Sequence, residues 1–333
     1  MNRFIAAFTI ALFLFPASAF AQSPVNARLA EIADAAGEIE PLETLIISRN
    51  GEILVEEGFR GHRTTGATNI KSASKSIVSA LVGIAIDKKL LTGPDQKIAP
   101  LLSGALPDNA DPRINDITIG HLLSMQAGLG RTSGPNYGRW VASRNWVRAA
   151  LAQPFENDPG SGMLYSTGST HLLSAILTRV GGKSTRELAR EWLGPVEGFS
   201  IASWDRDPQG IYLGGNQMAM TPRSLLAFGE LFRNRGMADG KRVLSESWID
   251  QSWEPRTRSV FSGEQYGYSW FIADMVGHPT YYAWGYGGQM LYIVPDLGLS
   301  VVMTSTEGPS ARNGHRDRLH GLMRDIVQAA EAA

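Results

Sequence analysis

The chain has 333 residues, of which 43% are hydrophobic and 19% charged, and its formal net charge at pH 7 is −1. This is a globular rather than a disordered composition, and the length permits one large domain or two smaller ones. The balanced charge gives no indication of a nucleic-acid partner, and the absence of cysteine excludes thiol catalysis, disulfides and cysteine-bound metals. Small molecules or a neutral polymer remain as ligands.

The N-terminal residues predict an export signal. A short start that contains Arg3 precedes an apolar run from Phe4 to Phe15, and Ala19-Phe20-Ala21 follows as a cleavage pattern. The run is too short to cross a bilayer comfortably. We expect residues 1–21 to be removed, a mature domain over residues 22–333 without a membrane span, and a periplasmic or secreted location.

The mature chain begins with patterns for a helix and a hairpin. Ser23-Pro24 is a typical helix start. Leu45–Arg49 then predicts a strand, Asn50-Gly51 a tight turn, and Glu52–Phe59 the returning strand.

A long helix is predicted from Ser72 to Lys88, and it is apolar nearly all round, which is typical of a helix buried at the centre of a protein. The stretch 128–162 is rich in Gly, Pro, Asn and Arg, so we interpret it as loop with one helix. The other helices predicted before the late strands cover residues 117–125, 143–152, 169–180 and 221–234.

Strands dominate the last third of the chain, before a final helix. We predict them over residues 267–273, 280–284, 289–294 and 299–304, followed by a helix over 316–330. A sheet whose strands come from both chain ends, with a helical region over roughly residues 73–260 inserted between them, fits this order best.

Ser72 and Lys75 form the first candidate pair for chemistry. They are three residues apart, so on a helix they share one face. A serine hydroxyl becomes a nucleophile when a base takes its proton, and a buried lysine with a lowered pKa can be that base. The alternative is a helix-capping serine beside a solvated lysine.

Two further segments contain candidate site residues. Tyr165 precedes a predicted buried helix, where its hydroxyl could relay a proton; the alternative is a tyrosine that only packs on the core. Gly285, Gly287 and Gly288 stand between two strands, where they let a substrate approach the backbone closely; the alternative is a plain Gly-rich hairpin. His171 is placed at the start of the predicted helix that follows Tyr165, and we interpret it as a structural residue.

In this order, the three segments resemble the serine β-lactamase and penicillin-binding superfamily, in particular its class C-related branch of esterases, D-aminopeptidases, D-alanyl-D-alanine carboxypeptidases and 6-aminohexanoate-dimer hydrolases. Ser72-Ala73-Ser74-Lys75 resembles the first motif, Tyr165-Ser166-Thr167 the second and Ala283-Trp284-Gly285 the third. Supporting stretches are 119–129, 220–222 and 266–270.

The resemblance implies an α+β fold: an antiparallel sheet flanked by N- and C-terminal helices, plus an all-helical region, with the site between them. Ser72 would form an acyl-enzyme, and Lys75 and Tyr165 would share the proton transfers, either one being the acylation base. Backbone N–H groups of Ser72 and Tyr286 would bind the oxyanion. No cofactor and no metal are expected. The residues expected to contact the substrate are Thr167, Trp284, Gly285, Gly287 and Trp140.

Two departures from the superfamily pattern bear on the substrate. Ala283 stands where β-lactamases have a cation that helps to hold the substrate carboxylate, and Thr167 replaces the usual Asn. We therefore expect a serine hydrolase of a neutral, small-molecule ester or amide. The alternatives are a β-lactamase or D-alanyl-D-alanine carboxypeptidase, and a non-catalytic ligand-binding protein of the same fold. The sequence leaves the oligomeric state open.

Overall fold

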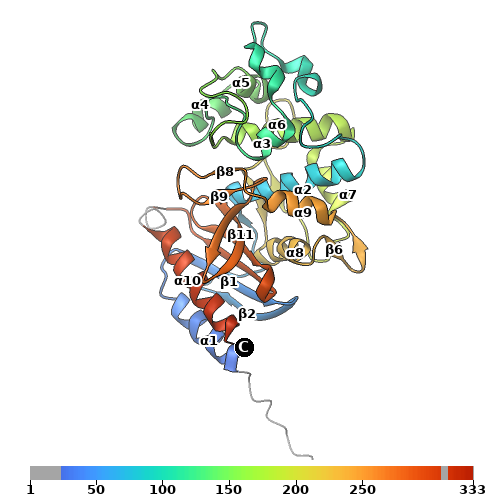
Figure 1. Cartoon of the computed structure of the whole chain (residues 1–333). Helices are drawn as coiled ribbons and strands as arrows, with labels where there is room; N and C mark the ends of the chain where they lie inside the picture. Colours follow the sequence, from blue (N-terminus) through green and yellow to red (C-terminus); the bar gives the residue numbers. More distant parts are fainter. Residues whose placement is uncertain (1–23, 309–313, 333) are drawn as a thin grey trace, which may run out of the picture.

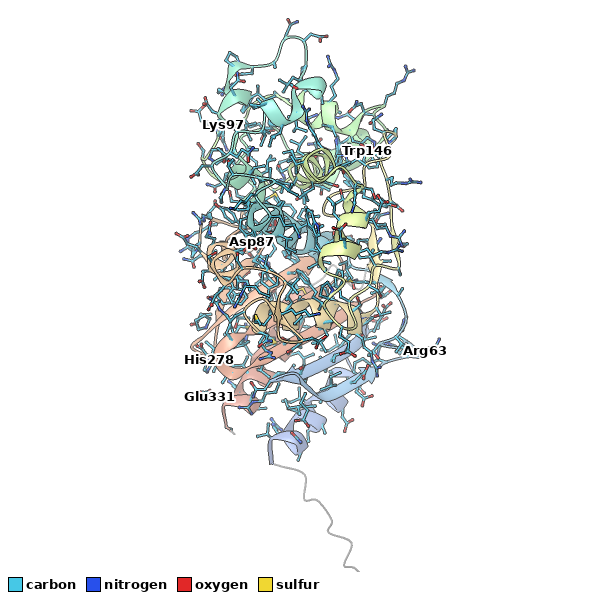
Figure 2. All side chains as sticks on the ribbon, turned by 90° about the vertical axis from the view of Figure 1, so that its right-hand side faces the viewer. Arg63, Asp87, Lys97, Trp146, His278 and Glu331 are labelled. Carbon is cyan, nitrogen blue, oxygen red and sulfur yellow. The ribbon has the colours of Figure 1, made fainter. Side chains whose placement is uncertain are left out.

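The protein consists of a sheet part and a helical part that lie one above the other (Figure 1). A computed structural model describes residues 24–308 and 314–332, so the predicted export signal lies outside the described residues. In Figure 2, Lys97 and Trp146 mark the helical part, whereas His278 and Glu331 mark the far end of the sheet part. Asp87, the last residue of the central helix, lies between them.

The main sheet has eight strands, all antiparallel to their neighbours, and its central strands come from opposite ends of the chain. Asn50 and Gly51 have φ values of 53° and 87°, so they form the left-handed turn that the Asn-Gly pair predicts. In spatial order the strands are β2 (Glu52–Gly58), β1 (Leu42–Arg49), β13 (Leu299–Ser305), β12 (Gln289–Val294), β11 (His278–Gly285), β10 (Phe271–Met275), β9 (Gln265–Tyr266) and β8 (Thr257–Arg258).

Both faces of the sheet are covered by helices. Helices α1 (Pro24–Ala36) and α10 (His315–Glu331) pack against each other on one face, and α8 (Pro222–Arg233) packs on β12 and β13 from the other (Figure 1). Because side chains alternate along a strand, Leu45 and Ile47 enter one core and Ile46 enters the other. This double coverage explains why these strands are apolar runs.

The helical part surrounds α2 (Ser74–Asp87), whose residues from Ser74 to Ala85 are all buried. Helix α6 (Thr167–Gly181) packs on α2. The prediction of a buried central helix is confirmed. The remaining helices are α3 (Ile119–Leu123), α4 (Tyr137–Val141), α5 (Trp146–Leu151), α7 (Thr185–Trp192) and α9 (Glu246–Trp253); two short sheets contain β3 (Thr68–Asn69), β5 (Met218–Met220) and β4 (Ser203–Trp204), and β6 (Met237–Ala238) and β7 (Lys241–Arg242).

The structure differs from the predicted elements in several places. The predicted strand over residues 267–273 is wrong at its start, because Gly267 to Trp270 forms a turn in which the Gly267 N–H donates to the Trp270 carbonyl. Helices α4, α7 and α9 were not predicted. Helix α8 falls inside the range 73–260 but packs on the sheet. Among the described helices, none has both the length and the apolar character needed to cross a bilayer.

Candidate active site

Ser72 lies in a short 3-10 turn, η1 (Lys71–Ala73), that leads directly into α2. Lys71 has a left-handed φ of 51°, so the backbone turns sharply just before Ser72. A Cβ atom on Gly285 would lie 2.2 Å from the carbonyl oxygen of Ile70. Glycine is therefore required at the end of β11, and it allows this strand end to lie against the turn that contains Ser72.

Lys75 is buried and its hydrogen-bond partners are all neutral. Its Nζ atom lies 3.0 Å from Ser72 Oγ, 2.6 Å from the carbonyl oxygen of Gly215 and 3.4 Å from Thr167 Oγ1. None of the ion pairs among the described residues includes Lys75, whose exposed fraction is 1%. Burial without a counter-charge lowers its pKa to about 7. A neutral amine that can accept the Ser72 proton is thus available near neutral pH.

Tyr165 lies beside both Ser72 and Lys75. Its hydroxyl is hydrogen-bonded to Ser72, and burial raises its pKa to about 12. The centroid of its ring lies 5.1 Å from Lys75 Nζ, and the ring packs against Phe261 and Phe271. Because the phenol keeps its proton at neutral pH, Tyr165 is suited to donate a proton rather than to remove one.

The segment 131–133 closes the N-terminus of α6. The Ser133 hydroxyl accepts from the Thr167 N–H at 2.8 Å, and the Thr132 hydroxyl accepts from the Gly168 N–H at 2.7 Å. Side-chain oxygens therefore satisfy N–H groups that the first helical turn leaves without partners. The same Ser133 hydroxyl lies 2.9 Å from Thr167 Oγ1, which fixes the Thr167 side chain that contacts the lysine.

Two glycines bring a carbonyl group to Lys75. Gly215 has a φ of 78°, and a Cβ atom there would lie 2.6 Å from Lys75 Cγ. A Cβ atom on Gly214 would lie 2.2 Å from the carbonyl oxygen of Thr170. Larger residues at these positions would clash, so the Gly-Gly pair is what allows the carbonyl of Gly215 to hold the amine.

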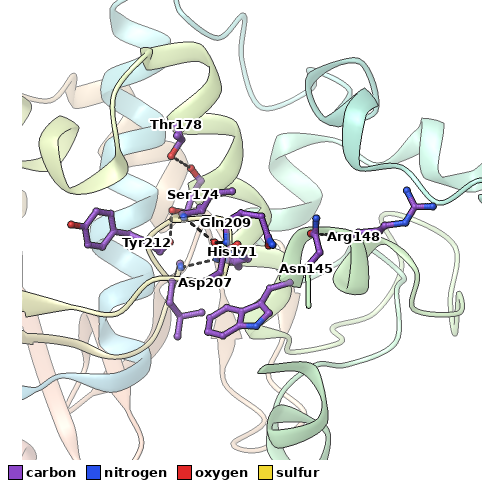
Figure 3. A network of polar contacts seen from close by, with 12 residues as sticks. Asn145, Arg148, His171, Ser174, Thr178, Asp207, Gln209 and Tyr212 are labelled. Carbon is purple, nitrogen blue, oxygen red and sulfur yellow. Dashed lines mark hydrogen bonds and ion pairs between the residues drawn. The ribbon is translucent and has the colours of Figure 1, made fainter. Parts of the chain in front are cut away.

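A buried histidine and aspartate support this glycine segment (Figure 3). The N–H of Gly214 donates to His171 Nδ1 at 3.3 Å, so His171 Nε2 carries the ring hydrogen and donates to Asp207 Oδ2 at 3.1 Å. The other oxygen of Asp207 accepts from the N–H groups of Gln209 and Ile211. His171 is therefore part of the scaffold, as interpreted from the sequence, although it lies within the first turns of α6 rather than at its start.

A cavity of about 320 Å³ opens in front of Ser72. Its wall is largely aromatic, and one member of it, Arg131, carries a formal charge. The residues that line it are Ser72, Arg131, Ser133, Gly134, Tyr137, Tyr165, Thr167, Asn216, Phe261, Phe271, Trp284 and Tyr286.

Several residues predicted to form the site meet at this cavity. Trp284 and Tyr286 lie on its wall, with Tyr286 exposed at the rim, and Gly285 and Gly287 belong to the backbone that carries them. Strand β11 pairs with β10 only as far as Tyr282, so its last residues extend beyond that neighbour.

Trp140 does not line the cavity, contrary to the prediction that it contacts substrate. Its exposed fraction is 3%, and its indole N–H donates to the carbonyl of Trp146. It packs behind Tyr137, and the Tyr137 ring reaches the wall in its place. An aromatic residue in a loop-rich stretch gives no sequence signal that separates these two positions.

Sequence reasoning also missed Arg131, Asn216 and the Gly214-Gly215 pair. The paired glycines were the one available signal for a close backbone approach. Among residues 24–308 and 314–332, no three His, Cys, Asp or Glu side chains are grouped in a way that could hold a metal ion.

Residues 40–322 match the family model described as Beta-lactamase. The chain therefore belongs to the β-lactamase family. This membership confirms the superfamily and the fold that were predicted from the motifs, and it supports the predicted serine hydrolase.

Two of the curated relatives have different descriptions. A 6-aminohexanoate-dimer hydrolase of Paenarthrobacter ureafaciens is 22% identical over 320 residues, which are 87% of this chain and 79% of that one. A protein of Dichelobacter nodosus described as fimbrial assembly protein FimD, serogroup H1, is 33% identical over 144 residues, 41% of this chain; the match covers 36% of that relative's length.

The fold is also that of a known hydrolase structure. EstCE1, described as a hydrolase with promiscuous acyltransferase activity, superposes with a TM-score of 0.73 at 16% identity over 92% of this chain and 98% of its own. This agreement extends over both the sheet part and the helical part.

Proposed function

We propose that this protein hydrolyses an ester or amide bond of a small molecule through a covalent acyl-enzyme on Ser72. The observation that carries the proposal is the 3.0 Å contact between Ser72 Oγ and the Nζ of Lys75, a buried lysine whose pKa is lowered to about 7. A hydroxyl beside a neutral amine is an activated nucleophile. A non-catalytic binding protein would have no need of such a lysine.

In the first half-reaction, Ser72 Oγ attacks the substrate carbonyl carbon while its proton passes to Lys75 Nζ. Oxygen develops a negative charge, for which the backbone N–H groups of Ser72 and Tyr286 are the proposed donors. The carbonyl then re-forms, the bond to the leaving group breaks, and the leaving group takes a proton from Lys75 by way of the Tyr165 hydroxyl. In the second half, water attacks the resulting ester while its proton passes to Lys75 Nζ. The bond to Ser72 Oγ then breaks, the acid leaves, and Lys75 returns the proton to Ser72.

The raised pKa of Tyr165 favours Lys75 as the acylation base. The 6-aminohexanoate-dimer hydrolase relative supports an amide or ester as the bond that is cleaved. We further propose that the protein is exported, which rests on the pattern of residues 1–21 alone.

A fluorophosphonate probe and a panel of p-nitrophenyl esters test the proposal. We expect the probe to label Ser72, and Ser72→Ala to lose labelling and at least about 10³-fold in kcat/KM. Ser74→Ala is the matched control, since Ser74 is two residues away and donates to the Lys71 carbonyl instead. Labelling that persists in Ser72→Ala would contradict the assignment.

The same panel should contain nitrocefin and a pentapeptide ending in D-Ala-D-Ala. Because Ala283 offers no cation at the position where β-lactamases hold the substrate carboxylate, we expect weak or no turnover of either compound. Efficient nitrocefin hydrolysis would instead identify the protein as a β-lactamase in activity as well as in family.

A further inference from the structure

Arg131 is the charged residue among the described residues that line the cavity. The other lining residues are hydroxyl, amide, aromatic or glycine residues, and no carboxylate is among them. Arg131 is half-buried, and none of the ion pairs among the described residues includes it. Arginine is a cation at all ordinary pH values, and no acidic side chain in the described part of the chain pairs with this one.

The local contacts hold the Arg131 side chain at the cavity. Its Nε donates to the carbonyl of Tyr165 at 3.1 Å, and the guanidinium carbon lies 5.1 Å above the Phe261 ring centroid. Gly134 lies beside the terminal nitrogens of Arg131 and has no side chain that could cover them. A Cβ atom on Gly134 would be 3.8 Å from Arg131 Nη2. One edge of the guanidinium is thus used for positioning, and no hydrogen bond of its terminal nitrogens occurs among the described residues.

We infer that the cavity takes acyl compounds that carry a carboxylate, and that Arg131 binds this group. Two parallel N–H donors of a guanidinium match the two oxygens of a carboxylate, and the Phe261 ring covers one face of the group. The inference rests on the proposed function, because it names the substrate class of the Ser72 site. It departs from the expectation of a neutral substrate, which rested on Ala283.

Arg131 does not occupy the position at which β-lactamases have their cation, which is Ala283 in this chain. Ala283 is buried in β11, in the sheet part. Arg131 comes from the segment that closes the N-terminus of α6, in the helical part. Its Nε donates to the carbonyl of Tyr165, two residues before that helix begins. The cation is therefore supplied from the helical wall of the cavity.

Matched pairs of esters test the inference. One pair is the mono-4-nitrophenyl ester of adipic acid and the same ester with a carboxamide in place of the free carboxylate. The second pair has the charge on the leaving group: 4-carboxyphenyl pentanoate and 4-carbamoylphenyl pentanoate. Within each pair the compounds differ in charge and hardly in size. The measured quantity is the ratio of kcat/KM for the carboxylate over the carboxamide at pH 7.5.

We expect this ratio to be about tenfold or more for at least one pair, as a charge-assisted bidentate contact allows. Arg131→Gln should bring the ratio to about one or below, and Arg131→Lys should retain part of the preference. Using a ratio within each variant cancels any common effect of losing the bond to Tyr165. Arg139→Gln is the control, since Arg139 is exposed and contacts Asn136 rather than the cavity; its ratio should equal that of the unchanged protein.

A ratio near one for both pairs in the unchanged protein would overturn the inference, as would a preference that survives in Arg131→Gln. Either result would leave the proposed function standing, because the esters would still be cleaved. The proposed function itself, and this inference with it, would fail if none of the four esters were hydrolysed and the fluorophosphonate probe did not label Ser72.

Discussion

Two buried polar centres lie on either side of the Gly214-Gly215 segment, and they differ in their charge balance. On one side, the carbonyl of Gly215 accepts from Lys75, whose partners are all neutral oxygens. On the other, the N–H of Gly214 donates to His171, which is paired with Asp207. Two adjacent residues therefore connect an unpaired basic group with a closed acid–base pair.

This difference in charge balance gives the two centres different roles: Lys75 is suited to react, and the His171–Asp207 pair is suited to support the backbone. A buried amine without a counter-charge is easily deprotonated, which is the property a general base needs. A buried aspartate whose oxygens all have donors has its charge satisfied, and it fixes the loop that it holds. We infer that the second centre keeps the Gly215 carbonyl in place for the first.

Lys75→Met should give the largest effect, because it removes the proposed base and keeps an unbranched apolar side chain. We expect kcat/KM for a p-nitrophenyl ester to fall about 10²- to 10⁴-fold. In the unchanged protein, kcat/KM should rise with pH through about 7 as Lys75 loses its proton. A pH profile that is flat from pH 6 to 8 would argue against Lys75 as the base.

Asp207→Asn should disturb the closed pair. The asparagine amide can place an N–H group opposite the Nε2–H of His171, so two donors would face each other unless the ring changes tautomer and leaves the Gly214 N–H without its acceptor. We expect the free energy of unfolding in urea to fall by about 2–4 kcal/mol. Asp205→Asn, two residues earlier and exposed, is the control and should change it by less than about 0.5 kcal/mol.

The stability of the protein should depend on pH through Lys75. Its pKa is about 7 in the folded chain and 10.5 in the unfolded chain, so between these values the unfolded state binds more protons. The free energy of unfolding should therefore gain from this group as pH rises from 7 towards 10.5, by an amount on the order of a few kcal/mol. Lys75→Met should lack this rise. Equal pH slopes for both proteins would contradict the lowered pKa.

Lys71→Met should have the smallest effect. Lys71 is four residues before Lys75, but its Nζ pairs with Glu307 at 2.9 Å, and Glu307 is 44% exposed. A partly solvated pair of this kind stabilises a protein by about 0–1 kcal/mol. We expect kcat/KM to remain within about fivefold of the unchanged protein, which thermal denaturation and an ester assay would check.

The sequence predicted the elements whose pattern is local. The Asn50-Gly51 turn, the apolar strands β12 and β13 and the buried helix α2 each follow from a few neighbouring residues. The turn at Gly267 to Trp270 was missed, because its cause is distant: a Cβ atom on Gly267 would lie 2.2 Å from the carbonyl oxygen of Ser252. Apolar alternation alone could not reveal that contact.

The site shows the same division. Ser72, Lys75 and Tyr165, which the structure brings together, were predicted because their spacing and order have a recognisable meaning. Arg131 and Gly215 were not, since their importance depends on which side chains the fold brings beside them. Trp140 was misplaced for the related reason that an aromatic residue suits a core and a cavity wall equally well.

The pairing of β1 with β13 has a consequence for how the chain folds. Thr44 and Thr304, whose hydroxyls lie 2.6 Å apart, are separated by 260 residues. Contacts of such long sequence separation form late, because closing the intervening loop costs conformational entropy before any contact compensates for it. The pairing of the first hairpin with β13 must therefore wait until the last strands have been synthesised. Likewise, Ser72 acquires its neighbour at Gly285 only when almost the whole chain is present.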